Sequence, residues 1–213
     1  MAIELPGMVS FLLSMTTLAL IYALLALGLN VHYGYTGLLN FGHVAFFAAG
    51  AYTAAIVTIP PPGTVSGGAD YAIGLGVPMP FGVVISLGAS ALVGGILALL
   101  IGLTSVRLGN HYLAIATFAL AGIFEEFIRN EAWLTRGVIG LNNVPKPGRS
   151  ALGADLWGLV YMLFAAALVV GTYLVIERLM GAPFGRLLKG IREDEQAARM
   201  LGKSTSQVKL KSF

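Results

Sequence analysis

The sequence has no cysteine and few charged residues. Of its 213 residues none is cysteine, and Asp, Glu, Lys and Arg together make up 11%. The absence of cysteine excludes disulfides, thiolate metal sites and cysteine nucleophiles. The scarcity of charge excludes an ordinary water-soluble surface, because about a quarter of the residues in soluble domains are charged. Most of the surface of this chain therefore needs lipid around it.

Motifs for catalysis and nucleotide binding are also missing. The chain has no G-x-x-x-x-G-K-[ST] phosphate loop, nucleophile elbow or zinc motif. Glu125 and Glu126 are adjacent, so on a helix they point about 100° apart and cannot form a facing acid–base pair. His43 has no second histidine or carboxylate at metal-ligand spacing. We therefore expect no enzyme activity, no cofactor and no metal site.

Long apolar runs are what the chain has instead. Hydrophobic residues make up 57% of it, and a helix of about 20 residues crosses a hydrocarbon core of about 30 Å. We predict an all-α, polytopic membrane helical bundle with about five transmembrane spans. The strongest runs are residues 8–29, 81–103 and 156–176, and weaker ones are 41–59 and 112–128.

The distribution of Lys and Arg predicts the orientation of these spans. Residues 177–213 are rich in Lys and Arg, whereas residues 60–80 have neither. Basic segments stay on the cytoplasmic side of a membrane. We therefore expect residues 1–176 to form a transmembrane region in the cell's cytoplasmic (inner) membrane. Residues 177–213 should form a C-terminal loop in the cytoplasm. Counting back from this loop through spans that cross in alternating directions places residues 129–155 outside the cell, although this segment is basic. The N-terminus is also external, unless residues 34–43 add a half-span.

Small residues recur at every fourth position of the span at 81–103. They place small side chains along one face of a helix, where a neighbouring helix can approach closely. We predict a packing seam on this face, and a small-residue lining of a pathway is the alternative. The residues are Gly82, Ser86, Ser90, Gly94, Ala98 and Gly102.

A stretch rich in glycine and polar residues joins the first two predicted spans. It reads N-V-H-Y-G-Y-T-G-L-L-N-F-G-H over residues 30–43. Irregular backbone at membrane depth is buried in protein or lines a wet cavity, as in the broken helices of transporters. We therefore predict a broken segment at 34–43, with Thr36, Asn40 and His43 as candidate translocation-pathway residues. An interfacial loop with Asn40 as N-cap and His43 in the first turn is the alternative.

At these residues the sequence resembles the permeases of the branched-chain amino acid ABC transporter family. Members carry a similar A-L-x-x-x-G-x-N-x-x-x-G-Y-T-G-L-x-x-x-G-H stretch. R-L-G-N-H-Y-L-A-I-A-T-F at 107–118 is similar to a pattern of the M-type subunit rather than the H-type subunit. T-R-G-V-I-G-L-N-N-V-P at 135–145 is similar to the external T-G-G-x-x-G-L-x-x-I-P. Arg136 replaces the first paired glycine there, which puts a positive φ at that position in question.

The C-terminal loop carries an amphipathic helical pattern. Its apolar residues share one face, interrupted by Asp194, and Glu195 and Arg199 pair at i,i+4. Such a helix binds either the membrane surface or another protein. A-A-R-M-L-G at 197–202 is similar to the A-A-x-x-x-G core of the loop with which ABC importer permeases dock their ATPases. The resemblance therefore implies a coupling helix whose candidate residues are Leu187, Ile191, Glu195, Ala197, Ala198, Leu201 and Gly202, the last ending the helix.

The resemblance also implies a function and partners. The expected function is a permease subunit of an importer for branched-chain, hydrophobic amino acids, powered by separate ATPase subunits. Expected partners are a second permease subunit, two ATPase subunits, an external substrate-binding protein and membrane lipid, and no nucleic acid. Because family members continue beyond this loop with further spans, the end at residues 209–213 leads us to expect a truncated product or a split gene.

Three alternatives remain open at this point. A permease for urea or a short amide would have the same architecture. An ion-coupled secondary transporter needs ionisable residues inside the membrane, for which Glu125 and Glu126 are the candidates. A membrane scaffold without transport activity is the third.

Overall fold

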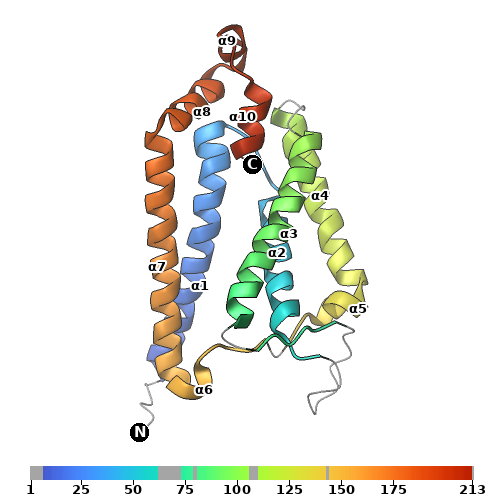
Figure 1. Ribbon diagram of the computed structural model, residues 1–213, viewed down its shortest axis with the longest axis vertical. Coiled ribbons are helices and arrows are strands. Elements are labelled where there is room, and N and C mark those ends of the chain that lie inside the picture. The colour runs from blue at the N-terminus through green and yellow to red at the C-terminus, as the bar shows by residue number, and fades with distance from the viewer. Residues whose placement is uncertain (1–6, 62–72, 79–80, 106–109, 143, 213) are drawn as a thin grey trace. The chain divides into compact units, whose positions relative to one another are not determined.

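The computed structural model describes residues 7–61, 73–78, 81–105, 110–142 and 144–212, and within them it contains helices and no strand (Figure 1). The predicted all-α class is confirmed. The described residues fall into two compact units. The first combines Met1–Leu39 with Gly148–Phe213, and the second is Asn40–Pro147.

The first unit is built on two long helices that pack along each other, α1 and α7 (Figure 1). Both are apolar on nearly all faces, as expected for helices surrounded by lipid. Three short helices follow α7 in the C-terminal loop. The elements are α1 (Gly7–Asn30), the π-helical turn η1 (Val31–Tyr35), α6 (Arg149–Leu152), α7 (Ala154–Gly181), α8 (Pro183–Glu193), α9 (Glu195–Met200) and α10 (Thr205–Ser212).

The second unit is built on three longer helices, α2, α3 and α4, of which α2 and α3 pack along each other (Figure 1). A short helix and a 3-10 turn follow α4. The elements are α2 (His43–Thr58), α3 (Phe81–Ser105), α4 (Asn110–Asn130), α5 (Ala132–Thr135) and η2 (Gly137–Ile139).

The small-residue row of α3 faces its neighbour, as predicted. Gly82, Ser86 and Gly102 are buried and the other three are half-buried, whereas large neighbours such as Val84 and Leu87 are exposed. The Ser90 hydroxyl donates a hydrogen bond of 2.8 Å to the carbonyl of Gly50 on α2. The packing seam is therefore confirmed around Ser90, whereas a Cβ added at Gly94 would meet no atom within 4 Å. It joins α3 to α2 through a small residue on each side.

Within the described residues, three helices are long and apolar enough to cross a membrane: Gly7–Tyr35, Phe81–Leu103 and Leu156–Gly181. They include the three strongest predicted spans. The weaker predictions also coincide with helices, but α2 has 16 residues and α4 carries charged residues in its last turns. A total of five spans therefore stays a prediction.

The amphipathic loop differs from the single helix that the sequence suggested. It is divided at Asp194, whose φ of −150° and ψ of 102° are extended rather than helical. The Asp194 carboxylate accepts a hydrogen bond of 2.9 Å from the backbone N–H of Ala197 and so caps α9. The aspartate that interrupts the apolar pattern therefore ends one helix and begins the next.

Candidate functional site

The first functional region is the end of α1, where the chain leaves helical structure. The helix widens into the π-turn η1, and the Thr36 hydroxyl donates to the carbonyl of Val31, five residues earlier, at 3.0 Å. Gly37 then adopts a φ of 70°, which favours glycine. Non-helical backbone continues to Gly42, and α2 begins at His43. The predicted break in helical structure is confirmed, although Gly34 still belongs to the π-turn, and its depth in the membrane stays a prediction.

Two of the three predicted pathway residues are almost completely buried. Thr36 and Asn40 are each 2% exposed. The Asn40 side-chain oxygen accepts a 3.0 Å hydrogen bond from the backbone N–H of Gly42, two residues on, and so shapes the turn before α2. His43 is half-buried at the first position of α2. Thr36 belongs to the first unit and the other two to the second, and their pathway role stays a prediction.

Within the first unit, helix α8 contacts the end of α1 through two positively charged side chains. Arg192 donates a hydrogen bond from Nη1 to the carbonyl of Gly34. Its stem lies against Gly37, where an added Cβ would be 2.7 Å from Arg192 Cγ. Lys189, one turn earlier on α8, places its ammonium 5.5 Å from the centre of the Tyr35 ring. The broken segment and the C-terminal loop, which were predicted separately, are therefore in direct contact.

The positive charges of α8 at this contact complement the partial negative charge at the C-terminal end of α1. The last carbonyls of a helix lack partners within it, and its C-terminus carries a partial negative charge of about one half. Lys189 and Arg192 bring positive charge to this end. Glu193 accepts hydrogen bonds from Nε and Nη2 of Arg192 at 3.1 and 2.6 Å, which leaves Nη1 for Gly34.

A second charged cluster holds the short helices after α8 together. Glu195 accepts hydrogen bonds of 2.7 Å from both Arg199 and the buried Lys209, and Arg199 also donates to the Thr205 hydroxyl at 3.0 Å. Partial burial raises the pKa of Glu195. The hydrogen bonds from Lys209 and Arg199 and the attraction of the Lys209 charge outweigh this and lower the pKa below its ordinary value. The cluster therefore ties α9 to α10.

The predicted coupling residues divide into an inner and an outer set. Ile191 and Ala198 are buried within the chain and Leu187 is half-buried, whereas Leu201 is 79% exposed. Glu195 is engaged in the charged cluster, and Ala197 is exposed. Met200, which is not among the residues predicted from the sequence, is 89% exposed.

Gly202 ends α9 in the predicted way. It has a φ of 74°, its N–H bonds to the carbonyl of Arg199, and the N–H of Lys203 bonds to the carbonyl of Ala198. This pair of hydrogen bonds is the Schellman arrangement that favours glycine. The exposed pair Met200 and Leu201 therefore stands at a defined helix end, which we call the α9 tip.

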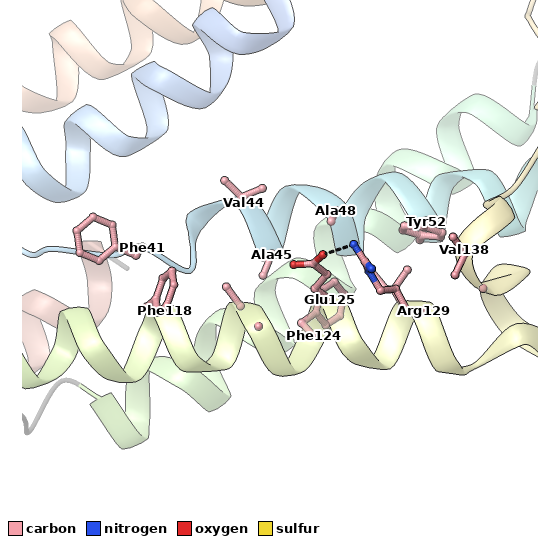
Figure 2. Close-up of a pocket in the computed structure, with 14 residues that line it drawn as sticks. Phe41, Val44, Ala45, Ala48, Tyr52, Phe118, Phe124, Glu125, Arg129 and Val138 are labelled. Atoms are coloured by element: carbon pink, nitrogen blue, oxygen red, sulfur yellow. Dashed lines mark ion pairs between the residues drawn. The ribbon is translucent and has the colours of Figure 1, made fainter.

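The second unit holds an apolar groove of about 580 Å³ between α2 and α4 (Figure 2). Figure 2 shows Phe41 and Phe118 at one end and Val138 at the other, with the Glu125–Arg129 ion pair between them. This ion pair spans 2.8 Å at i,i+4, and both side chains are more than half exposed. Among the described residues, no three His, Asp or Glu side chains come together as metal ligands would.

The T-R-G motif folds as a cap on the end of α4. The buried Thr135 hydroxyl contacts the carbonyls of Ile128 and Glu131 and accepts a 3.3 Å hydrogen bond from the N–H of Gly137. Arg136 has a φ of 63°, in the left-handed region. The positive φ that the motif's glycines suggest is therefore present although arginine occupies the position.

Comparison with known proteins supplies the family. The family model described as branched-chain amino acid transport system, permease component, matches residues 11–213. The chain belongs to this family. It is 32% identical to the high-affinity branched-chain amino acid transport system permease protein LivM of Escherichia coli (strain K12), over 100% of this chain and 51% of that protein. A probable LivM permease of Methanocaldococcus jannaschii is 25% identical, over 91% of this chain and 60% of that protein.

The chain spans about half the length of the LivM relatives from Escherichia coli and Salmonella typhimurium. No solved structure matches it. All four family-like motifs of the sequence lie inside the matched region, and the resemblance to the branched-chain amino acid permease family is confirmed. This is a family of membrane transport permeases.

The contact of this permease chain that sequence reasoning missed is the one made by Lys189 and Arg192. Their spacing of three residues was visible as a signal, because it places both on one helix face. Their partners were not visible, since Gly34 and Tyr35 lie more than 150 positions away in the chain and present a carbonyl and a ring face.

Proposed function

We propose that this chain is a permease subunit that moves branched-chain amino acids into the cell, driven by ATPase subunits bound to its C-terminal loop. Its family and its LivM relatives support this cargo. An external binding protein delivers the amino acid, and a second permease subunit completes the pathway. The phosphate loop that this chain lacks belongs to the ATPase partners.

The proposed orientation places the C-terminal loop in the cytoplasm and the protein in the inner membrane. Eight of its 13 Lys and Arg residues follow residue 177, and basic segments are retained on the cytoplasmic side. The T-R-G cap at the end of α4 then lies outside. This orientation puts the α9 tip on the side where ATP is available.

The observation that carries the ATPase coupling is the α9 tip. Met200 and Leu201 are 89% and 79% exposed, on helices that their own charged cluster and caps hold in place. Burying a leucine-sized side chain is worth about 1.5–3 kcal/mol. Two such side chains at a capped helix end fit the helix-in-groove mode of recognition, in which apolar anchors enter a partner's groove. Ile191 and Ala198 are instead buried within the chain and are not exposed to a partner.

The test is a charge placed at the tip. In the complete transporter reconstituted in proteoliposomes, Leu201→Asp should weaken ATPase association and reduce ATP-driven leucine uptake at least about tenfold, since one lost anchor of about 1.4 kcal/mol corresponds to a factor of ten. Ser206→Asp is the matched control, because it adds the same charge at an exposed position of α10. If Leu201→Asp assembles and transports like the parent, the tip is not the docking site.

Competition distinguishes the cargo. Excess unlabelled leucine should suppress uptake of labelled leucine, whereas excess urea should leave it unchanged. Uptake that persists without ATP and follows an ion gradient would instead support the secondary-transporter alternative.

A further inference from the structure

We propose that Arg192 is a positioning residue that transmits movement of the C-terminal loop to the broken segment at the end of α1. The inference rests on the proposed function, because it concerns how ATPase-driven movement reaches the membrane region. It is drawn from contacts inside the first unit, where α8 meets η1.

The first contact is a hydrogen bond to a backbone carbonyl of the π-turn. Arg192 donates from Nη1 to the carbonyl of Gly34. Four residues later, the N–H of Leu38 bonds instead to the carbonyl of His32, at 3.0 Å. The helical series of bonds therefore skips Gly34, and a side chain from α8 supplies the donor. Single π-turns of this kind occur frequently at functional positions in helices.

The second contact is steric and involves the glycine that starts the irregular backbone. Gly37 has a φ of 70°, and a Cβ there would lie 2.7 Å from Arg192 Cγ. The Arg192 stem therefore rests directly on the backbone at the point where the chain turns. Because one side chain both bonds to the π-turn and covers Gly37, α8 cannot shift by an ångström without breaking these contacts or moving the segment.

Two neighbours make the Arg192 contact directional. Glu193 holds Nε and Nη2 through hydrogen bonds of 3.1 and 2.6 Å, which fixes the plane of the guanidinium. Lys189 lies over the Tyr35 ring at 5.5 Å and adds a second attachment one helical turn away. Two attachments along α8 transmit a rotation of the helix as well as a translation. Arginine suits this position better than lysine, because its planar group can bond to Glu193 and Gly34 together.

The functional test uses the complete transporter with its ATPase subunits in proteoliposomes. Arg192→Gln should reduce leucine uptake per ATP hydrolysed about tenfold, the size of a coupling free energy of about 1.4 kcal/mol, while ATPase association and hydrolysis stay at the parent level. Arg192→Lys should recover part of this loss. Arg186→Gln is the matched control, because Arg186 lies exposed on the same helix and should leave coupling unchanged.

A labelling measurement tests the position of the segment without relying on transport. The chain has no cysteine, so Leu38→Cys, at a residue that is 1% exposed, gives a single reporter beside Gly37. Combining it with Arg192→Gln should raise the rate of maleimide labelling about tenfold, whereas combining it with Arg186→Gln should not. This readout remains informative even if the parent complex shows no ATP-driven uptake, which would overturn the proposed function.

The outcomes separate as follows. Faster labelling together with uncoupled hydrolysis supports the positioning role. Unchanged labelling in Arg192→Gln overturns it, whatever happens to uptake, because the segment then keeps its place without Arg192. Faster labelling with parent-level uptake per ATP also overturns it, since the contact would then be structural and would transmit nothing.

Discussion

Arg136 adopts a left-handed conformation in which residues with a Cβ are disfavoured by about 1–2 kcal/mol. Glycine removes this strain, although it loses about 0.5–1 kcal/mol through the greater freedom of the unfolded chain. We therefore expect Arg136→Gly to stabilise the protein by about 0.5–1 kcal/mol, measured as a higher thermal midpoint in detergent. Arg149→Gly, at the start of the helical turn α6, should not stabilise it. A lower midpoint for Arg136→Gly would mean that the arginine side chain contributes more than the strain costs.

Glu195 predicts a pH dependence of the C-terminal loop. In the folded protein its pKa lies below the ordinary glutamate value of 4.5. A carboxylate of this kind contributes stability that is complete above pH 4.5 and is lost as the pH falls through the lowered pKa. Hydrogen exchange of the α10 amides should therefore be constant between about pH 5 and 8, after correction for the intrinsic rate, and should show lost protection in more acidic solution. Glu195→Gln should be less protected at neutral pH and should not show the acidic transition.

Among the helices, the seam between α2 and α3 depends on small residues at one crossing. A Cβ on Gly50 would lie 3.8 Å from the Ser90 Cβ, so alanine is tolerated there and a larger side chain is not. We expect Gly50→Leu to destabilise the second unit by about 1–3 kcal/mol, the usual cost of overpacking. The measurement is the thermal midpoint in detergent. Gly88→Leu on the exposed side of α3, where no atom lies within 4 Å of an added Cβ, should have little effect. Equal effects of the two would contradict the seam.

The helices that the sequence predicted best are those marked by a long uncharged apolar run or by a regular repeat of small residues. Charge-free runs identified α1, α3 and α7, and the four-residue repeat identified the packed face of α3. The divided amphipathic segment was harder, because the apolar pattern continues through Asp194 and only the backbone shows that this aspartate caps α9. The Arg192 contact depends on where distant segments meet, which no local pattern encodes. The roles of Thr36, Asn40 and His43 stay predictions.

At the scale of the whole molecule, the α1, α3 and α7 helices expose large apolar side chains along much of their length. Such surfaces are stable against lipid or further helices, but not against water.

The proposed orientation can be tested on the whole protein with single cysteines, because the parent chain has none. Leu201→Cys should react with a membrane-impermeant thiol reagent in inverted vesicles and not in intact right-side-out vesicles. Val138→Cys, at an 83% exposed position after α5, should show the opposite pattern. Labelling of both from the same side would contradict the orientation derived from the Lys and Arg distribution.

The α9 helix has six residues, far fewer than the roughly 12–15 that an isolated helix needs to persist in water. Its carboxylate cap, its glycine stop and the Glu195 cluster hold it folded before any partner arrives. The conformational entropy of ordering these residues, about 1–2 kcal/mol each, is therefore lost when the chain folds and not when a partner binds. A preorganised tip of this kind should bind its partner without a coupled folding step, so that the frequency of correctly oriented encounters sets the association rate. Mutations in the tip should then change the affinity mainly through the dissociation rate.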